Sequence, residues 1–345
     1  MSHSFVSNTT AAGANQFFFE SAPEKRHTCR VSYRVTTAGT YPYSLTFTNV
    51  LDSTYADGSL GRVNLPCKPW VIHSLRAAPC KGITEEALPF VTLAEGVTVS
   101  AEAPYHTPPV SLTVEAYLCI EMTFSGSMLP YHEETLLPIL KKTEAGWQPT
   151  KKMPLPRLVG IQREVKGKIG FVGDSITQGI GTPMDSYTHW NALLTEKLKE
   201  NYACHNLGIG YARAHDLATM GAWMEKAMEQ DVIFLCLGAN DILQGYPEQQ
   251  IKKDLAAIVS AFKNAGKTVV LQAVPPFEYG AEKLLLWKRI NTFVQETLAP
   301  MADVYFDPAT VLTSDGKTPL YGGHPNETGC ALWAEALYQA VRHLF

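Results

Sequence analysis

Four short segments of this chain carry side chains that could do covalent chemistry. Ser175 follows the apolar run KIGFVG, and Asn240 follows the apolar run DVIFLCLG. A glycine-rich segment, NLGIGY at 206–211, and a histidine, His324, complete the set. Together they supply a hydroxyl, a side-chain amide, backbone N–H donors and an imidazole, which are the groups that acyl transfer needs.

Each group has its own role in such chemistry. Neutral serine is a poor nucleophile, so attack by Ser175 on a carbonyl needs a base, and His324 suits that task because imidazole titrates near neutral pH. Asn240 Nδ2 and the backbone N–H groups of Ser175, Gly210 and Tyr211 are the expected donors to the oxyanion, each worth roughly 3 kcal/mol. We therefore predict Ser175, His324 and Asn240 as catalytic residues.

The elements that must position these groups belong to the C-terminal half. Residues 168–345 alternate short apolar runs with amphipathic segments, which predicts a parallel sheet covered by helices on both faces. Chemistry in such sheets gathers where strands end and helices begin. Ser175, the 206–211 segment and Asn240 follow the first three predicted strands, and His324 precedes the last predicted helix.

The N-terminal half shows a different pattern. Within residues 1–150, apolar and polar residues alternate with a period of two between Gly, Pro, Asp and Asn turns, which predicts an all-β sandwich or jelly roll. Residues 151–167 are polar and contain Pro154 and Pro156, so we predict a linker there. The catalytic domain is then expected at 168–345.

The C-terminal segment resembles the SGNH, or GDSL, hydrolases. Ser175 resembles the nucleophile of their first sequence block, Asn240 the asparagine of the third and His324 the histidine of the fifth. The resemblance implies a three-layer α/β/α fold of the flavodoxin type and a serine esterase activity. LTFTNVLDSTYADGS and GVTVSAEAPYHTPPVSLTVEA carry a weaker likeness to the sandwich that precedes the SGNH domain in some esterases, including carbohydrate esterase family 2.

The chain departs from the family pattern at two positions. Tyr211 stands where the second block normally has a glycine whose N–H enters the oxyanion hole; either the Tyr211 N–H serves or the loop shifts so that Gly210 or Gly208 does. Tyr321 stands where an aspartate normally precedes the histidine by three residues. Without that carboxylate, the imidazole needs another partner to fix its tautomer.

We therefore predict a Ser175–His324 dyad oriented by a main-chain carbonyl, as the resemblance to some carbohydrate esterase family 2 enzymes implies. Asp315 or Asp307 folding back onto the histidine is the alternative. Tyr187, Trp190 and Tyr321 are expected to line the substrate site, although the apolar face on which Trp190 lies favours a place in the core.

Several function classes are excluded by composition and motifs. A net charge of −4 gives no basic footprint for nucleic acid. No segment reads as a membrane span or a leader, so we expect a cytoplasmic protein. Seven cysteines without a C-x-x-C pair predict reduced core residues, and no complete phosphate-loop or zinc motif is present, so neither a cofactor nor a metal is expected.

The substrate expected from these observations is a small ester. Acetyl is the expected acyl group, and an acetylated sugar is the expected alcohol by analogy with the two-domain carbohydrate esterases. A lipase, lysophospholipase or thioesterase remains an alternative within the same family. An inactive hydrolase domain beside a carbohydrate-binding sandwich is the alternative from another class.

Overall fold

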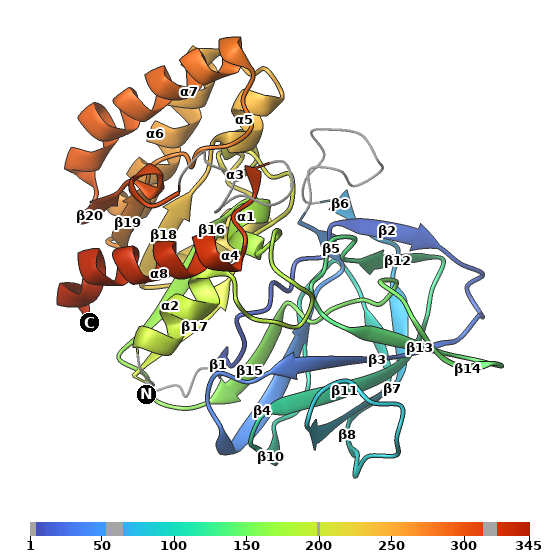
Figure 1. Ribbon diagram of the computed structural model, residues 1–345. Helices are drawn as coiled ribbons and strands as arrows, with labels where there is room; N and C mark the ends of the chain where they lie inside the picture. Colours follow the sequence, from blue (N-terminus) through green and yellow to red (C-terminus); the bar gives the residue numbers. More distant parts are fainter. Residues whose placement is uncertain (1–4, 53–64, 199–200, 313–322) are drawn as a thin grey trace. The chain divides into compact units, whose positions relative to one another are not determined.

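The computed structural model describes residues 5–52, 65–198, 201–312 and 323–345. It divides into two compact units, Met1–Val165 and Lys166–Phe345. Figure 1 shows that the first unit is built of strands and the second of alternating strands and helices.

The N-terminal unit contains two antiparallel sheets packed face to face. The order is β1-β15-β4-β10 in one sheet, with β9 paired to β4, and β14-β13-β3-β11-β7-β8 in the other. Phe47 of β4 meets Trp70 of β7 edge to face, with ring centroids 6.1 Å apart, which places the core between the sheets. The strands of the first sheet are β1 (Phe5–Ser7), β4 (Gly39–Phe47), β9 (Tyr105–His106), β10 (Val110–Val114) and β15 (Leu158–Gln162).

The second sheet has six strands, and the same unit also contains two separate two-stranded ribbons. Its strands are β3 (His27–Arg34), β7 (Trp70–Cys80), β8 (Val91–Val99), β11 (Tyr117–Ser125), β13 (Ile139–Thr143) and β14 (Gly146–Pro149). The ribbons pair β2 (Phe17–Glu20) with β12 (Met128–Tyr131) and β5 (Val50–Leu51) with β6 (Leu65–Pro66). The antiparallel sandwich predicted from the alternating pattern is present.

Strand β15 corrects the predicted linker at 151–167. Leu158–Gln162 pairs with β4 on one side and β1 on the other, so it is an interior strand. Val159 and Ile161 are buried in the core. Pro154 and Pro156 come before the strand and leave its backbone N–H groups intact, so prolines that indicated a linker only precede the last strand of the sandwich.

The C-terminal unit is built on a parallel sheet. The strand order β17-β16-β18-β19-β20 is the 2-1-3-4-5 order of flavodoxin-like folds, as expected. All four pairings are parallel. The strands are β16 (Gly167–Gly173), β17 (Tyr202–Asn206), β18 (Val232–Cys236), β19 (Thr268–Gln272) and β20 (Val304–Phe306).

Helices cover both faces of this sheet (Figure 1). Helices α2 and α8 pack together over one face, and α6 packs beside β19 on the other. The helices are α1 (Ser175–Gln178), α2 (Trp190–Leu198), α3 (Ala214–Leu217), α4 (Ala222–Met228), α5 (Ala239–Leu243), α6 (Glu248–Asn264), α7 (Ala281–Phe293) and α8 (Glu327–Val341). The described residues also contain a short π-helix (Val294–Leu298) and 3₁₀ turns at Ala299–Met301, η3 (Pro308–Thr310) and Arg342–Leu344.

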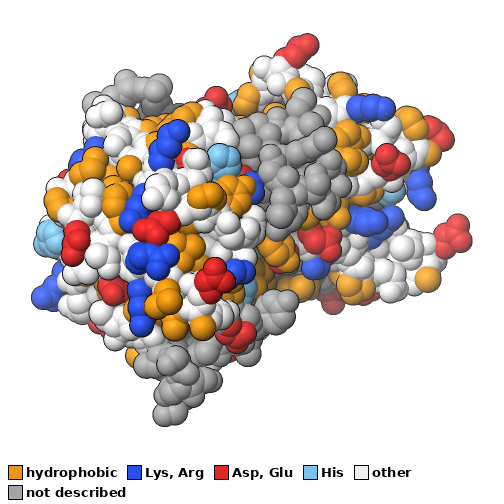
Figure 2. Space-filling model, turned by 90° about the horizontal axis from the view of Figure 1, so that it is seen from above, with side chains coloured by type: hydrophobic (Ala, Val, Ile, Leu, Met, Phe, Trp, Pro, Cys, Tyr) orange, Lys and Arg blue, Asp and Glu red, His pale blue; other side chains and the backbone are white. Residues whose placement is uncertain are grey.

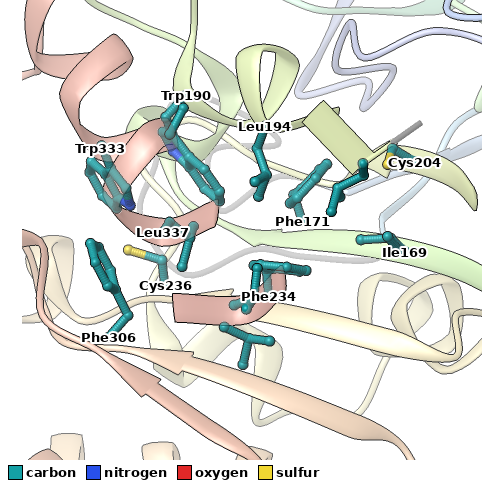
Figure 3. Close-up of a cluster of buried hydrophobic side chains, with 14 of the residues drawn as sticks. Ile169, Phe171, Trp190, Leu194, Cys204, Phe234, Cys236, Phe306, Trp333 and Leu337 are labelled. Carbon is teal, nitrogen blue, oxygen red and sulfur yellow. The ribbon is translucent and has the colours of Figure 1, made fainter. Parts of the chain in front are cut away.

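An aromatic core holds the α2–α8 layer against the sheet (Figure 3). Trp190 of α2 stacks on Trp333 of α8 with ring centroids 5.2 Å apart and planes 6° apart. Phe171 of β16 meets Trp190 edge to face at 5.4 Å and lies 5.3 Å from Phe234 of β18. Aromatic side chains of the adjacent strands β16 and β18 therefore belong to the core that holds α2 and α8.

The described residues also show other surface and composition features. On the face that Figure 2 displays, Lys and Arg side chains are interspersed with Asp and Glu. Within the described ranges, no helix is long and apolar enough to span a membrane, and no group of three or more metal-ligating side chains gathers. All seven cysteines are free thiols, six of them buried.

Candidate active site

The nucleophile candidate, Ser175, opens a one-turn helix directly after strand β16. Asp174 caps this helix, because its Oδ1 accepts a hydrogen bond of 3.0 Å from the Ile176 N–H. A Cβ on Gly173 would lie 2.0 Å from Thr177 Oγ1 and 2.6 Å from Cys236 O, so only glycine allows this close turn. The turn leaves the Ser175 side chain half-buried at the carboxyl end of the strand.

His324 is placed by the start of helix α8. Asn326 caps that helix through Oδ1, which accepts from the Gly329 N–H at 2.9 Å. Gly323 has a φ of +88°, and a Cβ there would lie 2.8 Å from Glu278 N, so the chain passes tightly under the segment that follows β19. The His324 ring is buried. It packs edge to face against the Phe277 ring, with ring centroids 5.1 Å apart.

These two elements bring the serine and the histidine together. Ser175 Oγ and His324 Nε2 lie 2.8 Å apart, which is hydrogen-bonding distance. This is the arrangement in which an imidazole removes the hydroxyl proton as the oxygen attacks.

Asn240 lies at the start of helix α5, which follows strand β18. Strand β18 pairs with β16 so that Cys236 lies opposite Gly173, and helices α1 and α5 therefore begin at the same sheet edge. The Asn240 Nδ2 donates one hydrogen bond, 3.0 Å, to Ala212 O. An amide group carries two N–H bonds, so Asn240 has the donor capacity to hold the 206–214 loop and to bind a second oxygen.

The glycine-rich loop, residues 206–211, is bound to the end of strand β16 and to helix α1. Its Ile209 N–H donates to Gly173 O at 3.0 Å. The Gly208 N–H donates to Asn206 Oδ1 at 2.9 Å, and the Gly210 N–H donates to Gln178 Oε1 at 2.7 Å. In this structure the Gly210 N–H is therefore bound by a side chain that the sequence did not single out, and its role as an oxyanion donor stays a prediction.

Tyr211 adopts the left-handed conformation, with φ of +61°, and its side chain is 43% exposed. This conformation costs a non-glycine residue roughly 1–2 kcal/mol. The usual glycine of the family would avoid that strain, which accounts physically for a glycine being the expected residue. The Tyr211 N–H stays the predicted backbone donor from this loop.

Two buried carboxyl groups brace the loops of the site. Burial raises the pKa of Asp174 to about 7, and the nearby Asp241 adds to the rise. Burial likewise raises the pKa of Asp241 to about 6, although its carboxylate accepts the N–H groups of Ala214 at 2.8 Å and His215 at 3.3 Å. Both side chains accept hydrogen bonds from backbone N–H groups, so both have a structural role.

The predicted substrate-lining residues fall in different places. Trp190 has no exposed surface and is stacked in the core, so its assignment to a substrate site is wrong. Its ring lies between the sheet and α8 because the apolar face of α2 must be buried there. Tyr187 is 6% exposed, with φ of +54°, and its contact with substrate stays a prediction. Tyr321 lies outside the described residues.

Of the two aspartates considered as partners of the His324 ring, only Asp307 lies in the part of the chain that the structure describes. Asp315 lies outside the described residues. Asp307 caps the 3₁₀ turn η3, where its Oδ1 accepts from the Ala309 N–H at 2.9 Å. The main-chain carbonyl partner of the histidine stays a prediction.

Sequence reasoning missed three side chains that support the site. Gln178 holds the Gly210 N–H, and Phe277 packs against the His324 ring. Asn191 Nδ2 donates to Thr177 O at 2.5 Å and its Oδ1 accepts from Asn206 Nδ2 at 3.3 Å, so it links α1 to the loop. The position of Gln178 three residues after Ser175 is a local signal; nothing in the local sequence marks Phe277 or Asn191.

The model of the GDSL-like lipase/acylhydrolase family matches residues 171–332. The C-terminal unit of the chain is therefore a GDSL-like lipase/acylhydrolase domain, and Ser175, Asn240 and His324 all lie within the matched segment.

Known relatives cover different parts of the chain. An arylesterase of Vibrio mimicus is 30% identical over 118 residues, which is 33% of this chain and 58% of the relative. An acetylxylan esterase of Xylanibacter ruminicola is 24% identical over 254 residues, 63% of this chain and 49% of the relative. The chain thus spans about half the length of these relatives. A solved variant of the acetyl-xylooligosaccharide esterase Axe2 from Geobacillus Stearmophilus is 17% identical, with a TM-score of 0.44, and covers 52% of this chain and 95% of that one.

Proposed function

We propose that this protein is a carboxylic ester hydrolase that removes small acyl groups, acetyl above all, through a Ser175–His324 dyad. The observation that carries the proposal is the 2.8 Å contact between Ser175 Oγ and His324 Nε2 at the carboxyl edge of the sheet. A hydroxyl and an imidazole at this distance form the nucleophile and general base of acyl transfer.

The first half of the reaction forms an acyl-enzyme. Ser175 Oγ attacks the ester carbonyl carbon while His324 Nε2 takes the hydroxyl proton, and the carbonyl oxygen becomes an oxyanion. The Asn240 Nδ2–H and the backbone N–H groups of Ser175 and Tyr211 donate to that oxygen. The tetrahedral intermediate collapses, the bond to the alcohol oxygen breaks, and His324 gives its proton to the leaving alcohol.

The second half releases the acid. Water attacks the acyl carbon while His324 takes one of its protons, and the second tetrahedral intermediate expels Ser175 Oγ, which recovers the proton from His324. One ester and one water thus give one alcohol and one carboxylic acid, and the protein returns to its starting state.

An acetylated sugar is the proposed natural alcohol. The support is the similarity to an acetylxylan esterase over 254 residues, a stretch longer than the hydrolase domain alone. The N-terminal sandwich supplies a second folded unit of the kind expected from the resemblance to carbohydrate esterases. The substrate of the relative is a property of that protein, so direct assay must decide it for this chain.

The test compares p-nitrophenyl acetate, butyrate and octanoate with acetylated xylooligosaccharides as substrates of the wild type and Ser175→Ala. We expect the highest kcat/KM on acetyl esters and a loss of about 10⁴-fold or more in Ser175→Ala. Ser260→Ala, on helix α6, is the matched control and should keep wild-type activity. Absence of activity on every ester would contradict the proposed function, and preference for octanoate would replace it with a lipase or thioesterase.

A further inference from the structure

Arg213 is a buried cation two residues after Tyr211. Its side chain is 2% exposed. Nε and Nη2 donate to the two carboxylate oxygens of Asp216 at 2.9 and 2.5 Å. Nη1 donates to Gln244 Oε1 at 3.3 Å and to the Tyr246 hydroxyl, and the guanidinium lies 5.0 Å from the centre of the Tyr246 ring. The side chain therefore joins the glycine-rich loop to the turn between α5 and α6.

A buried ion pair of this kind generally contributes little net free energy to folding. Taking both charges out of water costs free energy that their attraction only partly returns, and apolar replacements of similar volume are often neutral. A guanidinium does supply rigid donors in a planar fork, which fixes the geometry of what it holds. Arg213 uses that fork on Asp216, in the helix α3 that directly follows it, and on two residues beyond α5.

Tyr211 needs such constraint more than its neighbours do. Its left-handed conformation persists only where the surroundings over-determine the backbone. On the upstream side, the Gly210 N–H is held by Gln178 of α1, the helix that begins at Ser175. On the downstream side, Ala212 O is held by Asn240 of α5.

The residues after Ala212 continue the restraint. Arg213 is fastened through its side chain to Gln244 and Tyr246. The Ala214 N–H is held by Asp241, the neighbour of Asn240. The strained peptide is thus clamped between the helix that carries the nucleophile and the helix that carries the amide donor.

We propose that Arg213 is a positioning residue that holds Tyr211 in its left-handed conformation, so that the Tyr211 N–H is fixed as an oxyanion donor relative to Ser175. Arg213 touches no reacting atom and acts through the backbone of the loop. The inference rests on the proposed esterase function.

The first arm of the test removes the clamp. Arg213→Met keeps the approximate volume of the side chain and removes the fork, and we expect kcat on p-nitrophenyl acetate to fall about 10- to 100-fold, less than the loss of a whole oxyanion donor, with KM changed less than about threefold. Tyr246→Phe, which deletes one hydroxyl, is the milder variant and should lower kcat a few-fold. Arg289→Met is the matched control, because Arg289 forms an exposed pair with Glu248, and it should keep wild-type kinetics.

The second arm distinguishes positioning from general stability. Glycine adopts the left-handed region without strain, so Tyr211→Gly placed in the Arg213→Met background should restore kcat by about threefold or more. A merely structural Arg213 would predict no recovery of kcat, even where glycine raises the Tm by relieving the strain at position 211.

The third arm does not depend on activity. Hydrogen–deuterium exchange of peptides that cover residues 209–214 should rise in Arg213→Met and Tyr246→Phe and stay unchanged in Arg289→Met. Wild-type kcat in Arg213→Met, or no recovery with Tyr211→Gly, would overturn the inference while Ser175→Ala still reports on the esterase function. A wild type that hydrolyses no ester would overturn both.

Discussion

Ser175 and His324 are 149 residues apart in the chain, yet Ser175 Oγ and His324 Nε2 are separated by only 2.8 Å. The parallel sheet explains this convergence, because the segments after its strands all emerge at one edge. Strands β16 and β18 are neighbours at the point where the strand order reverses. The segments that carry Ser175 and Asn240 follow these two strands, so both lie at that point of the edge. The histidine reaches the same edge from the start of α8.

Loss of the Asn240 amide should slow the chemical step. Asn240→Ala removes a donor whose loss typically costs about 10²- to 10³-fold in kcat, with KM changed only a few-fold. Steady-state kinetics on p-nitrophenyl acetate measure this split. Asn264→Ala, at the exposed end of α6, serves as control. A decrease in kcat below threefold for Asn240→Ala would exclude the amide as a transition-state donor.

A dyad and a triad differ in what an aspartate contributes. If a main-chain carbonyl orients His324, then Asp315→Ala and Asp307→Ala keep kcat within a few-fold of the wild type, although removal of the Asp307 cap lowers stability by about 1 kcal/mol. A kcat loss on the order of 10⁴-fold in either variant would instead identify the third member of a triad.

The buried Asp174 contributes less to stability as pH rises. Its folded-state pKa of about 7 lies above the ordinary value of 3.8, so the folded protein binds a proton that the unfolded chain has lost between about pH 4 and pH 7. The contribution of Asp174 to stability is therefore greatest below this window and decreases through it. Asp174→Asn keeps an oxygen to cap Ile176 but cannot ionise.

Thermal unfolding at several pH values tests this linkage. The Tm of Asp174→Asn relative to wild type should increase from pH 5 to pH 8, corresponding to a free-energy difference on the order of a few kcal/mol. Asp241 is present in both proteins, so its own raised pKa acts on both curves. A constant or decreasing Tm difference over that range would contradict the assignment.

The Trp190 ring should matter for folding rather than for substrate. Trp190→Ala removes a fully buried ring from between Phe171 and Trp333 and should cost about 3–5 kcal/mol of unfolding free energy. The milder Trp190→Phe should fold and keep the wild-type KM for p-nitrophenyl acetate. A several-fold change of KM in a stable Trp190→Phe would return the ring to the substrate site.

The parallel sheet and the places of Ser175, Asn240 and His324 were predictable from local signals. Uniformly apolar strands mark a sheet buried on both faces, and each polar segment directly follows such a strand or precedes a helix. The sandwich was equally readable from its period of two. Leu158–Gln162 was not, because a short apolar run after two prolines is ambiguous until its partners β1 and β4 are known.

The donors of the oxyanion hole were less predictable. Gly210 and Tyr211 are adjacent, and the Gly210 N–H is bound by Gln178, a residue of helix α1 that is distant in sequence. A positive φ at a tyrosine has no sequence signature, because it is imposed by tertiary contacts rather than by the preference of the residue. The clamp at Arg213 is likewise visible only once Gln244 and Tyr246 lie beside it.

Covalent trapping tests the nucleophile most directly. A p-nitrophenyl alkylphosphonate resembles the tetrahedral intermediate and phosphonylates an activated serine, and peptide mass spectrometry locates the adduct. We expect one adduct per chain, on Ser175, with release of p-nitrophenol in proportion, and no adduct in Ser175→Ala or His324→Ala. A stable adduct on another residue, or wild-type ester hydrolysis that continues in Ser175→Ala, would contradict the central assignment.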